Sequence, residues 1–215
     1  MGVRATYGEH DREPIHGLPG VLPPGESVLW QGAPAWRSLA LDAYRVRQLS
    51  IYFAIILLAR GGWLLAGGSG VVEALRGCVG PALMFLICLG ILTGIAALAA
   101  RATVYTITDR RVVIRQGVAL ESSLNLPFKA IETADLRMHA DGTGDIALQT
   151  VREQRVSYFW LWPHVRPWHL ARPQPSLRNI ADARTAADIL AGALAAAQPA
   201  AAANGRDPQL AGVSA

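Results

Sequence analysis

The chain lacks the sequence motifs of the common enzyme classes. Its 215 residues contain no Gly-x-Ser-x-Gly elbow, no Walker loop and no His-Glu-x-x-His motif. The glycine-rich run from Gly67 to Gly70 fits a turn between helices better than a phosphate cradle. We therefore expect a protein that is not an enzyme and that uses no cofactor and no catalytic metal.

Cysteine and lysine are scarce. Cys78 and Cys88 are ten residues apart in one apolar stretch, so a helix would separate them by about 15 Å, too far for a disulfide. Lys129 is the only lysine, and the net charge of +4 is too small and too scattered to indicate nucleic-acid binding. The first 15 residues are polar, without the apolar core of a cleavable signal peptide.

Histidine is absent from the two longest apolar stretches of the chain, residues 48–66 and 78–100. The five histidines are His10, His16, His139, His164 and His169. Neither apolar stretch therefore offers an imidazole that could ligate a metal or a cofactor. His164 and His169 leave two alternatives open, metal ligands or hydrogen-bonded packing residues. The second is favoured, since no clear third ligand accompanies them.

Two stretches are long enough to cross a membrane. Residues 78–100 are 23 consecutive residues without a charge, more than the roughly 20 that a spanning helix needs. Residues 48–66 have span length but contain Arg60, which is either a snorkelling anchor or the partner of an acidic group on another protein's helix. The short link, residues 67–77, predicts an antiparallel hairpin.

Arginines flank the hairpin on one side. The link carries only Arg76, so the positive-inside rule predicts that both termini are cytoplasmic. These flanking arginines are candidates for contact with anionic lipid or, alternatively, solvated charges. The candidates are Arg45, Arg47, Arg101, Arg110, Arg111 and Arg115.

The remainder of the chain has a β-rich pattern. Strands are expected at 28–31, 104–107, 112–114, 130–138 and 145–150, and a helix with a small apolar face is expected after Asp182. Residues 157–162 fit either a strand or an aromatic edge resting on the membrane. The predicted fold is an α+β membrane protein, a two-helix hairpin with a small β-barrel or sandwich closed by a helix.

Five segments follow from this pattern. They are a flexible arm at 1–15, a cytoplasmic segment at 16–47, the hairpin at 48–100, the β-domain at 101–197 and a disordered tail at 198–215. The proline-rich stretch 163–180 is either a solvated strip or a docking surface, because arginine and tryptophan are common in interface hot spots. The candidate partner-binding residues are Trp30, Trp36, Arg60, His164, Arg166, Trp168, His169, Arg172 and Arg178.

Four motifs carry a family resemblance. Pro24–Pro34 (PGESVLWQGAP) and Tyr105–Gly117 (YTITDRRVVIRQG) resemble bacterial membrane proteins that carry a pleckstrin-homology-like (PH-like) domain. His16–Pro23 and Pro163–Arg178 resemble, more narrowly, the PuhB family of photosynthetic complex assembly proteins of purple bacteria. The resemblance covers roughly residues 14–197.

The resemblance implies a function that periodicity and charge do not. It implies a membrane-anchored assembly factor for the photosynthetic reaction centre and its light-harvesting complex. The partners it implies are their polypeptides, with the H subunit as one candidate, together with membrane lipid and a second copy of the chain as a homodimer. The alternative is a general membrane-anchored PH-like module that binds lipid or other membrane proteins.

Overall fold

The computed structural model describes residues 22–118, 121–151 and 157–204. The chain forms two compact units, one made of Met1–Pro34 together with Ala102–Ala215 and the other of Ala35–Arg101. We call the first the β-domain and the second the helical unit. The predicted arm at 1–15, with residues 16–21, and the end of the predicted tail, 205–215, lie outside the described residues.

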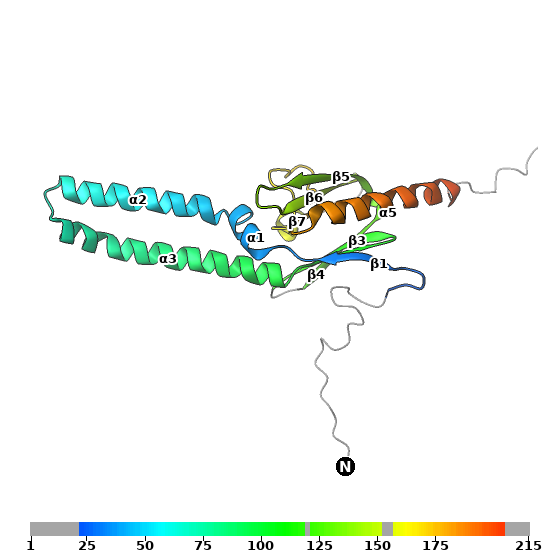
Figure 1. Cartoon of the computed structure of the whole chain (residues 1–215), viewed down its shortest axis with the longest axis horizontal. Helices are drawn as coiled ribbons and strands as arrows, with labels where there is room; N and C mark the ends of the chain where they lie inside the picture. Colours follow the sequence, from blue (N-terminus) through cyan, green and yellow to red (C-terminus); the bar gives the residue numbers. More distant parts are fainter. Residues whose placement is uncertain (1–21, 119–120, 152–156, 205–215) are drawn as a thin grey trace, which may run out of the picture. The chain divides into compact units, whose positions relative to one another are not determined.

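The helical unit contains α1 (Trp36–Asp42), α2 (Val46–Ala66) and α3 (Val71–Arg101). α2 and α3 run side by side (Figure 1), and the rings of Phe53 and Phe85 stack between them with centroids 4.1 Å apart. Both helices are long and apolar enough to cross a membrane, and almost none of the residues in their apolar windows is buried in the protein. A core helix of a soluble protein would be mostly buried, so this exposure favours a lipid environment.

The ends of these helices differ from the prediction. The helical part before the first span is divided into two helices, because Arg45 adopts a left-handed conformation (φ 53°) between α1 and α2. The predicted link at 67–77 is also shorter, since α3 already begins at Val71. Only residues 67–70 connect the two helices, so they form a tight antiparallel hairpin.

The β-domain consists of two antiparallel sheets. One has the order β1 (Val28–Gly32), β2 (Val104–Thr108), β3 (Arg111–Gln116) and β4 (Ser122–Pro127). The other has the order β5 (Ile131–Met138), β6 (Gly144–Thr150) and β7 (Ser176–Ile180), and the 3₁₀ turn Phe128–Ala130 joins β4 to β5. The described strands therefore form two separate sheets rather than a closed barrel.

The predicted hairpin at 104–114 is confirmed. β-branched residues fill β2 and β3, and Ile107 pairs with Val112 across the turn. The Thr108 hydroxyl closes this turn by accepting the N–H groups of Arg110 and Arg111 at 3.2 and 3.0 Å. Strands β1, β5 and β6 were also predicted, within one or two residues at each end.

The core lies between the sheets and α5 (Ala183–Asn204), which contacts β1, β5 and β6. Its buried face contains Ala183, Ala186, Leu190 and Ala193, as the 3–4 spacing predicted. Large side chains from both sheets complete this core, among them Tyr105, Ile107, Leu126, Leu148 and Leu177. The helix runs to Asn204, past the predicted end at residue 197.

Candidate functional site

The proline-rich stretch folds back on itself instead of extending as a strip. The Arg166 N–H donates to the Gln174 carbonyl at 2.9 Å, and the Ser176 N–H donates to the His164 carbonyl at 3.0 Å. The short helix α4 (Tyr158–Leu161) precedes this loop, so the strand alternative for residues 157–162 is wrong, and the aromatic edge resting on the membrane stays a prediction. The end of the stretch, Ser176–Ile180, is strand β7 and lies inside the domain.

His164 lies at the centre of a buried hydrogen-bond network. Its Nδ1 is 2.6 Å from the Tyr105 hydroxyl and its Nε2 is 3.0 Å from the Thr103 hydroxyl. The Tyr105 hydroxyl also accepts the backbone N–H of Arg178 at 3.1 Å. Donation of the Tyr105 proton to Nδ1, with the imidazole proton on Nε2, gives the hydroxyl and both ring nitrogens a partner.

This environment keeps the imidazole neutral. Burial, and secondarily the nearby Arg178 guanidinium, lowers the pKa of His164 to about 3. Burial also raises the pKa of Tyr105. Because both ring nitrogens of His164 have partners, the packing alternative describes this histidine and the metal-ligand alternative does not.

Arg178 is also an interior residue. Its side chain is 5% exposed, its Nε lies 3.6 Å from Asp145 Oδ2, and its Nη1 donates to the Pro163 carbonyl at 3.3 Å. Asp145 accepts the Asn179 N–H at 2.8 Å and lies 3.1 Å from His139 Nε2. Arg178 therefore ties β7 to β6 and to the loop, a structural position that the docking hypothesis did not foresee.

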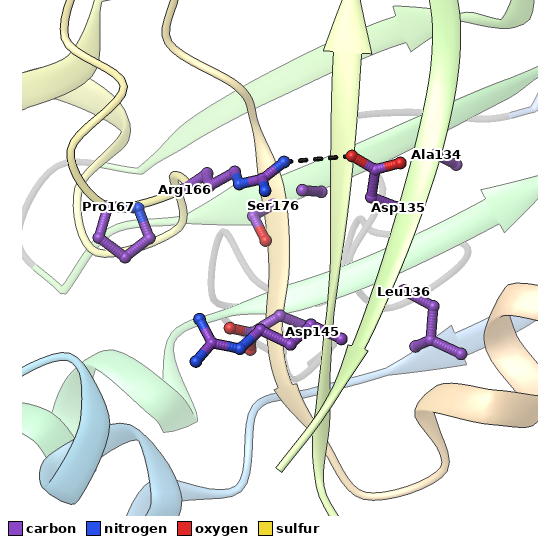
Figure 2. A pocket seen from close by; sticks show the side chains of 9 residues that line it. Ala134, Asp135, Leu136, Asp145, Arg166, Pro167 and Ser176 are labelled. Carbon is purple, nitrogen blue, oxygen red and sulfur yellow. Dashed lines mark hydrogen bonds and ion pairs between the residues drawn. The ribbon is translucent and has the colours of Figure 1, made fainter.

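A groove of about 520 Å³ opens beside this network, on the sheet formed by β5, β6 and β7. Figure 2 shows Arg166 reaching across it to Asp135, with Nη1 and Oδ2 3.1 Å apart. The same nitrogen lies 3.0 Å from Gln174 Oε1. The groove carries charges of both signs and is lined by Ala134, Asp135, Leu136, Arg137, Asp145, Ala147, Arg166, Pro167 and Ser176.

The outer residues of the loop stand beside the groove. Trp168 is 82% exposed and has a positive φ of 66°, which a non-glycine residue rarely adopts. Arg172 is exposed, and His169 is half-buried with its Nδ1 2.9 Å from the Pro167 carbonyl. We call Arg166, Trp168 and Arg172 the loop face. Of the predicted strip, these residues and His169 reach the surface, whereas His164 and Arg178 do not.

The two predicted tryptophans have different environments. Trp30 in β1 is half-buried and packs against the core. Trp36 is 44% exposed, and the Arg37 guanidinium carbon lies 5.3 Å from its ring centroid. Trp36 can therefore offer surface to a partner, while Trp30 is mainly a packing residue.

Three of the flanking arginines make contacts inside the β-domain. Arg111 forms a bidentate ion pair with Glu26 at 2.7 and 2.9 Å, and Arg110 donates to the Gly25 carbonyl at 3.1 Å. Arg115 lies 2.7 Å from Glu121. These contacts hold the N-terminal turn and β4 in place. Arg45, Arg47 and Arg101 are exposed, and lipid contact by any of the six stays a prediction.

Arg60 has a partner inside its own hairpin. Its Nε donates to the Gly77 carbonyl of α3 at 2.9 Å. In a regular helix that carbonyl would accept the N–H of residue 81, but residue 81 is proline and has none. Arg60 thus satisfies the carbonyl that Pro81 leaves without a helical donor. Pairing with another protein stays a prediction for its remaining donors.

Close packing accompanies this hydrogen bond. A Cβ at Gly77 would lie 2.7 Å from Leu64 Cδ1, and one at Gly61 would lie 3.7 Å from Cys78 Sγ. Small residues let the backbones of α2 and α3 approach each other, as is common between membrane helices. Gly61 and Gly77 are therefore part of the contact between α2 and α3.

Sequence reasoning missed Tyr105, Asp135, Asp145 and Glu26 as site and anchoring residues. Tyr105 and Glu26 lie within the motifs quoted above, so a signal existed for them. Asp135 and Asp145 carry no local signal, because their importance depends on Arg166 and Arg178, which follow more than 30 residues later.

Comparison with known proteins supports the architecture. Residues 47–194 match the bacterial PH domain family, a range that includes both apolar helices except Val46 and six of the seven strands. A Rhodobacter capsulatus protein described as "Uncharacterized 23.7 kDa protein in puhA 5'region" is 38% identical over 183 residues, which cover 85% of this chain and 86% of that protein. No solved structure matches. The chain therefore belongs to the bacterial PH domain family.

Proposed function

We propose that the protein is a membrane-anchored assembly factor for the bacterial photosynthetic reaction centre and its light-harvesting complex. The observation that carries this proposal is the similarity to a protein encoded beside puhA over 85% of the chain. The motifs that resemble the PuhB family point to the same role. The protein would act by contact with its partners, without catalysis.

The loop face is the proposed docking surface on the β-domain. Trp168 and Arg172 are exposed and the Arg166 side chain is 40% exposed, while the buried His164 and Arg178 give them a rigid base. The groove beside them offers Asp135 and Arg137 to polar groups of a partner. A preorganised surface of this kind binds at a lower entropy cost than a flexible strip.

The proposed location is the inner, intracytoplasmic membrane, with both termini in the cytoplasm. The arginine distribution supports this orientation, since Arg45, Arg47 and Arg101 flank the ends of the hairpin, whereas Arg60 and Arg76 are the arginines nearer its turn. In this orientation the loop face lies on the cytoplasmic side, where it can meet reaction-centre polypeptides, the H subunit among them. A homodimer is a further possibility that co-purification can reveal.

The test is affinity purification of tagged protein from pigmented membranes, followed by mass spectrometry. We expect reaction-centre or light-harvesting polypeptides to be enriched with the natural protein. A triple variant, Arg166→Ala, Trp168→Ala and Arg172→Ala, should stay in the membrane at normal level but lose this enrichment. Recovery of lipid alone would instead support a general membrane-anchored PH-like module.

A further inference from the structure

Three aromatic side chains of the β-domain are exposed close together in the sequence. Phe159 and Trp160 belong to α4, and Trp162 follows it directly. Their exposed fractions are 84%, 55% and 44%. Neighbouring exposed aromatic residues are costly in water and mark surfaces that another phase or molecule covers. We call these three residues the aromatic finger.

The base of the aromatic finger is held in place. Leu161, between the exposed residues, is fully buried, and its carbonyl accepts the His164 N–H at 2.7 Å. The carbonyl of Trp160 accepts the side-chain amide of Gln116, in β3, at 2.9 Å. The outward direction of the aromatic rings is therefore set by the fold and is not the result of a loose loop.

The base of the aromatic finger is hydrogen-bonded to the segment that follows α3 in the sequence. His164 Nε2 lies 3.0 Å from the hydroxyl of Thr103, and Thr103 follows Arg101, the last residue of α3, by two residues. Consecutive Cα atoms are 3.8 Å apart, so the Cα of Thr103 lies within about 8 Å of that helix end. The aromatic finger lies a few residues from His164 in the sequence, so its base is bonded to the segment of the β-domain that directly follows α3.

The chemistry of the segment suits a lipid surface. Residues 157–175 contain Arg166 and Arg172 but no aspartate or glutamate. Tryptophan prefers the headgroup level of a bilayer, where its apolar ring and its N–H both find suitable surroundings. An acid-free segment also avoids repulsion by anionic headgroups, which lower the local potential at the cytoplasmic surface.

We propose that Phe159, Trp160 and Trp162 insert into the headgroup region of the membrane that contains α2 and α3. The aromatic finger would be a third attachment point, which restrains the β-domain at the lipid surface. The partner is the bilayer itself, and the loop face stays available for protein. This proposal rests on the membrane embedding proposed above and does not depend on the identity of a photosynthetic partner.

The test measures the depth of a spin label in the full chain. Phe159→Cys is labelled in a Cys78→Ser/Cys88→Ser background and reconstituted into nanodiscs of phosphatidylcholine and phosphatidylglycerol. Two matched labels serve as references, Met84→Cys on the exposed surface of α3 and Ser123→Cys on the exposed surface of β4. Collision with a water-soluble nickel reagent is compared with collision with oxygen, which concentrates in lipid.

We expect the Phe159→Cys label to lose access to nickel relative to the Ser123→Cys label and to gain access to oxygen. Adding Trp160→Ala and Trp162→Ala should return the label to water. If the Met84→Cys label is protected and the Phe159→Cys label is not, the proposed insertion of the aromatic finger is wrong, while the membrane embedding of the hairpin is supported. If the Met84→Cys label is itself in water, the membrane embedding and the aromatic finger both fail. If the Phe159→Cys label is protected from nickel in native pigmented membranes but not in nanodiscs, the aromatic finger contacts a protein, and the proposed lipid contact is wrong.

Discussion

At the scale of single residues, His164 connects parts of the chain that are distant in sequence. Its ring lies between Thr103, next to the end of α3, and Tyr105 in β2, while its own backbone pairs with Ser176. A protonated ring would carry a proton on Nδ1, where Tyr105 donates, and would lie near the Arg178 guanidinium. The network therefore depends on a neutral imidazole.

The first prediction is a pH dependence of stability. The pKa of His164 is about 3 in the folded protein and about 6.5 in an unfolded chain, so the unfolded state binds the proton more readily between these values. The contribution of the neutral His164 to the free energy of unfolding is therefore complete above about pH 6.5. It falls by about 1.4 kcal/mol per pH unit as the pH drops toward 3. Thermal unfolding in detergent between pH 7.5 and 4.5 measures the slope.

His164→Gln is the matched variant for this measurement, since glutamine keeps hydrogen-bonding groups but does not titrate. The variant is expected to be less stable at pH 7.5 and to show a shallower decline on acidification. Equal slopes for the two proteins would mean that other groups, and not His164, cause the acid sensitivity.

Arg60 links the two helices of the hairpin through its hydrogen bond to the Gly77 carbonyl. The second prediction tests this bond with a double-mutant cycle. Arg60→Ala leaves the Gly77 carbonyl without a donor and should destabilise the hairpin. Pro81→Ala supplies the missing N–H, so the same Arg60→Ala change should cost less in that background. The expected coupling is about 1 kcal/mol, the scale of hydrogen bonds between membrane helices. Denaturation in mixed micelles measures it.

Strict additivity in this cycle would contradict the link between Arg60 and Pro81. Arg60→Lys is the control for charge, because a lysine ammonium lacks the fixed guanidinium geometry that directs Nε at Gly77. A charge effect alone would leave this variant as stable as the natural protein.

At the scale of elements, the strongest sequence patterns gave the correct elements and the weaker ones did not. The two apolar helices and the β2–β3 hairpin follow from long or regular patterns. β4 was missed because its core-facing residues are only Leu124 and Leu126, alternating with polar residues. β7 was missed because all five of its residues are buried although three are polar or charged, which hides any alternation.

The candidate site was predictable only in part. The exposure of Trp168 and Arg172 agrees with a surface role, but the burial of Arg178 depends on Asp145 and on the Pro163 carbonyl. Such long-range pairs leave no trace in local spacing. Periodicity alone therefore assigns an arginine to a surface by default, and only the tertiary structure shows the exception.

The third prediction concerns the contact that holds the N-terminal turn to the β2–β3 hairpin. The Glu26 side chain is 2% exposed and receives two hydrogen bonds from Arg111. Glu26→Ala should destabilise the β-domain by about 1.5–3 kcal/mol, because the charged donors lose a buried acceptor. Chemical denaturation followed by tryptophan fluorescence measures the loss.

Glu121→Ala provides the comparison for Glu26→Ala. Glu121 also pairs with an arginine at 2.7 Å, but its side chain is 60% exposed. Exposed pairs contribute about 0–1 kcal/mol, so this variant should be close to the natural protein. Similar losses in both variants would show that burial does not distinguish the two pairs.

At the scale of the whole molecule, the β-domain is assembled from segments that precede and follow the helical unit in the sequence. β1 precedes α2 and α3 in the sequence, yet it pairs with β2, which follows them. Residues 16–47 were predicted as a segment separate from the β-domain, and the structure divides the chain differently by including β1. The match to the bacterial PH domain family begins at residue 47, so this strand lies outside the matched range.

This arrangement leads to a prediction about membrane topology that does not use the arginine distribution. Two strands of one sheet cannot pair across a bilayer, because their backbone groups must meet at hydrogen-bond distance. The segments before α2 and after α3 therefore lie on the same side. Single cysteines at Ser27→Cys and Ser123→Cys, in a background without Cys78 and Cys88, should react with an impermeant maleimide from one side, and Ser69→Cys from the other.

Vesicles of known sidedness then show on which side of the membrane the β-domain lies, which strand pairing alone does not determine. With inside-out vesicles, reaction at Ser27→Cys and Ser123→Cys would place the β-domain in the cytoplasm, as the flanking arginines predict. Reaction of these two positions from opposite sides would contradict the β1–β2 pairing itself, since a chain with one or three crossings could not form it. An even number of crossings is thus required by the sheet, and the two apolar helices of the hairpin supply that number.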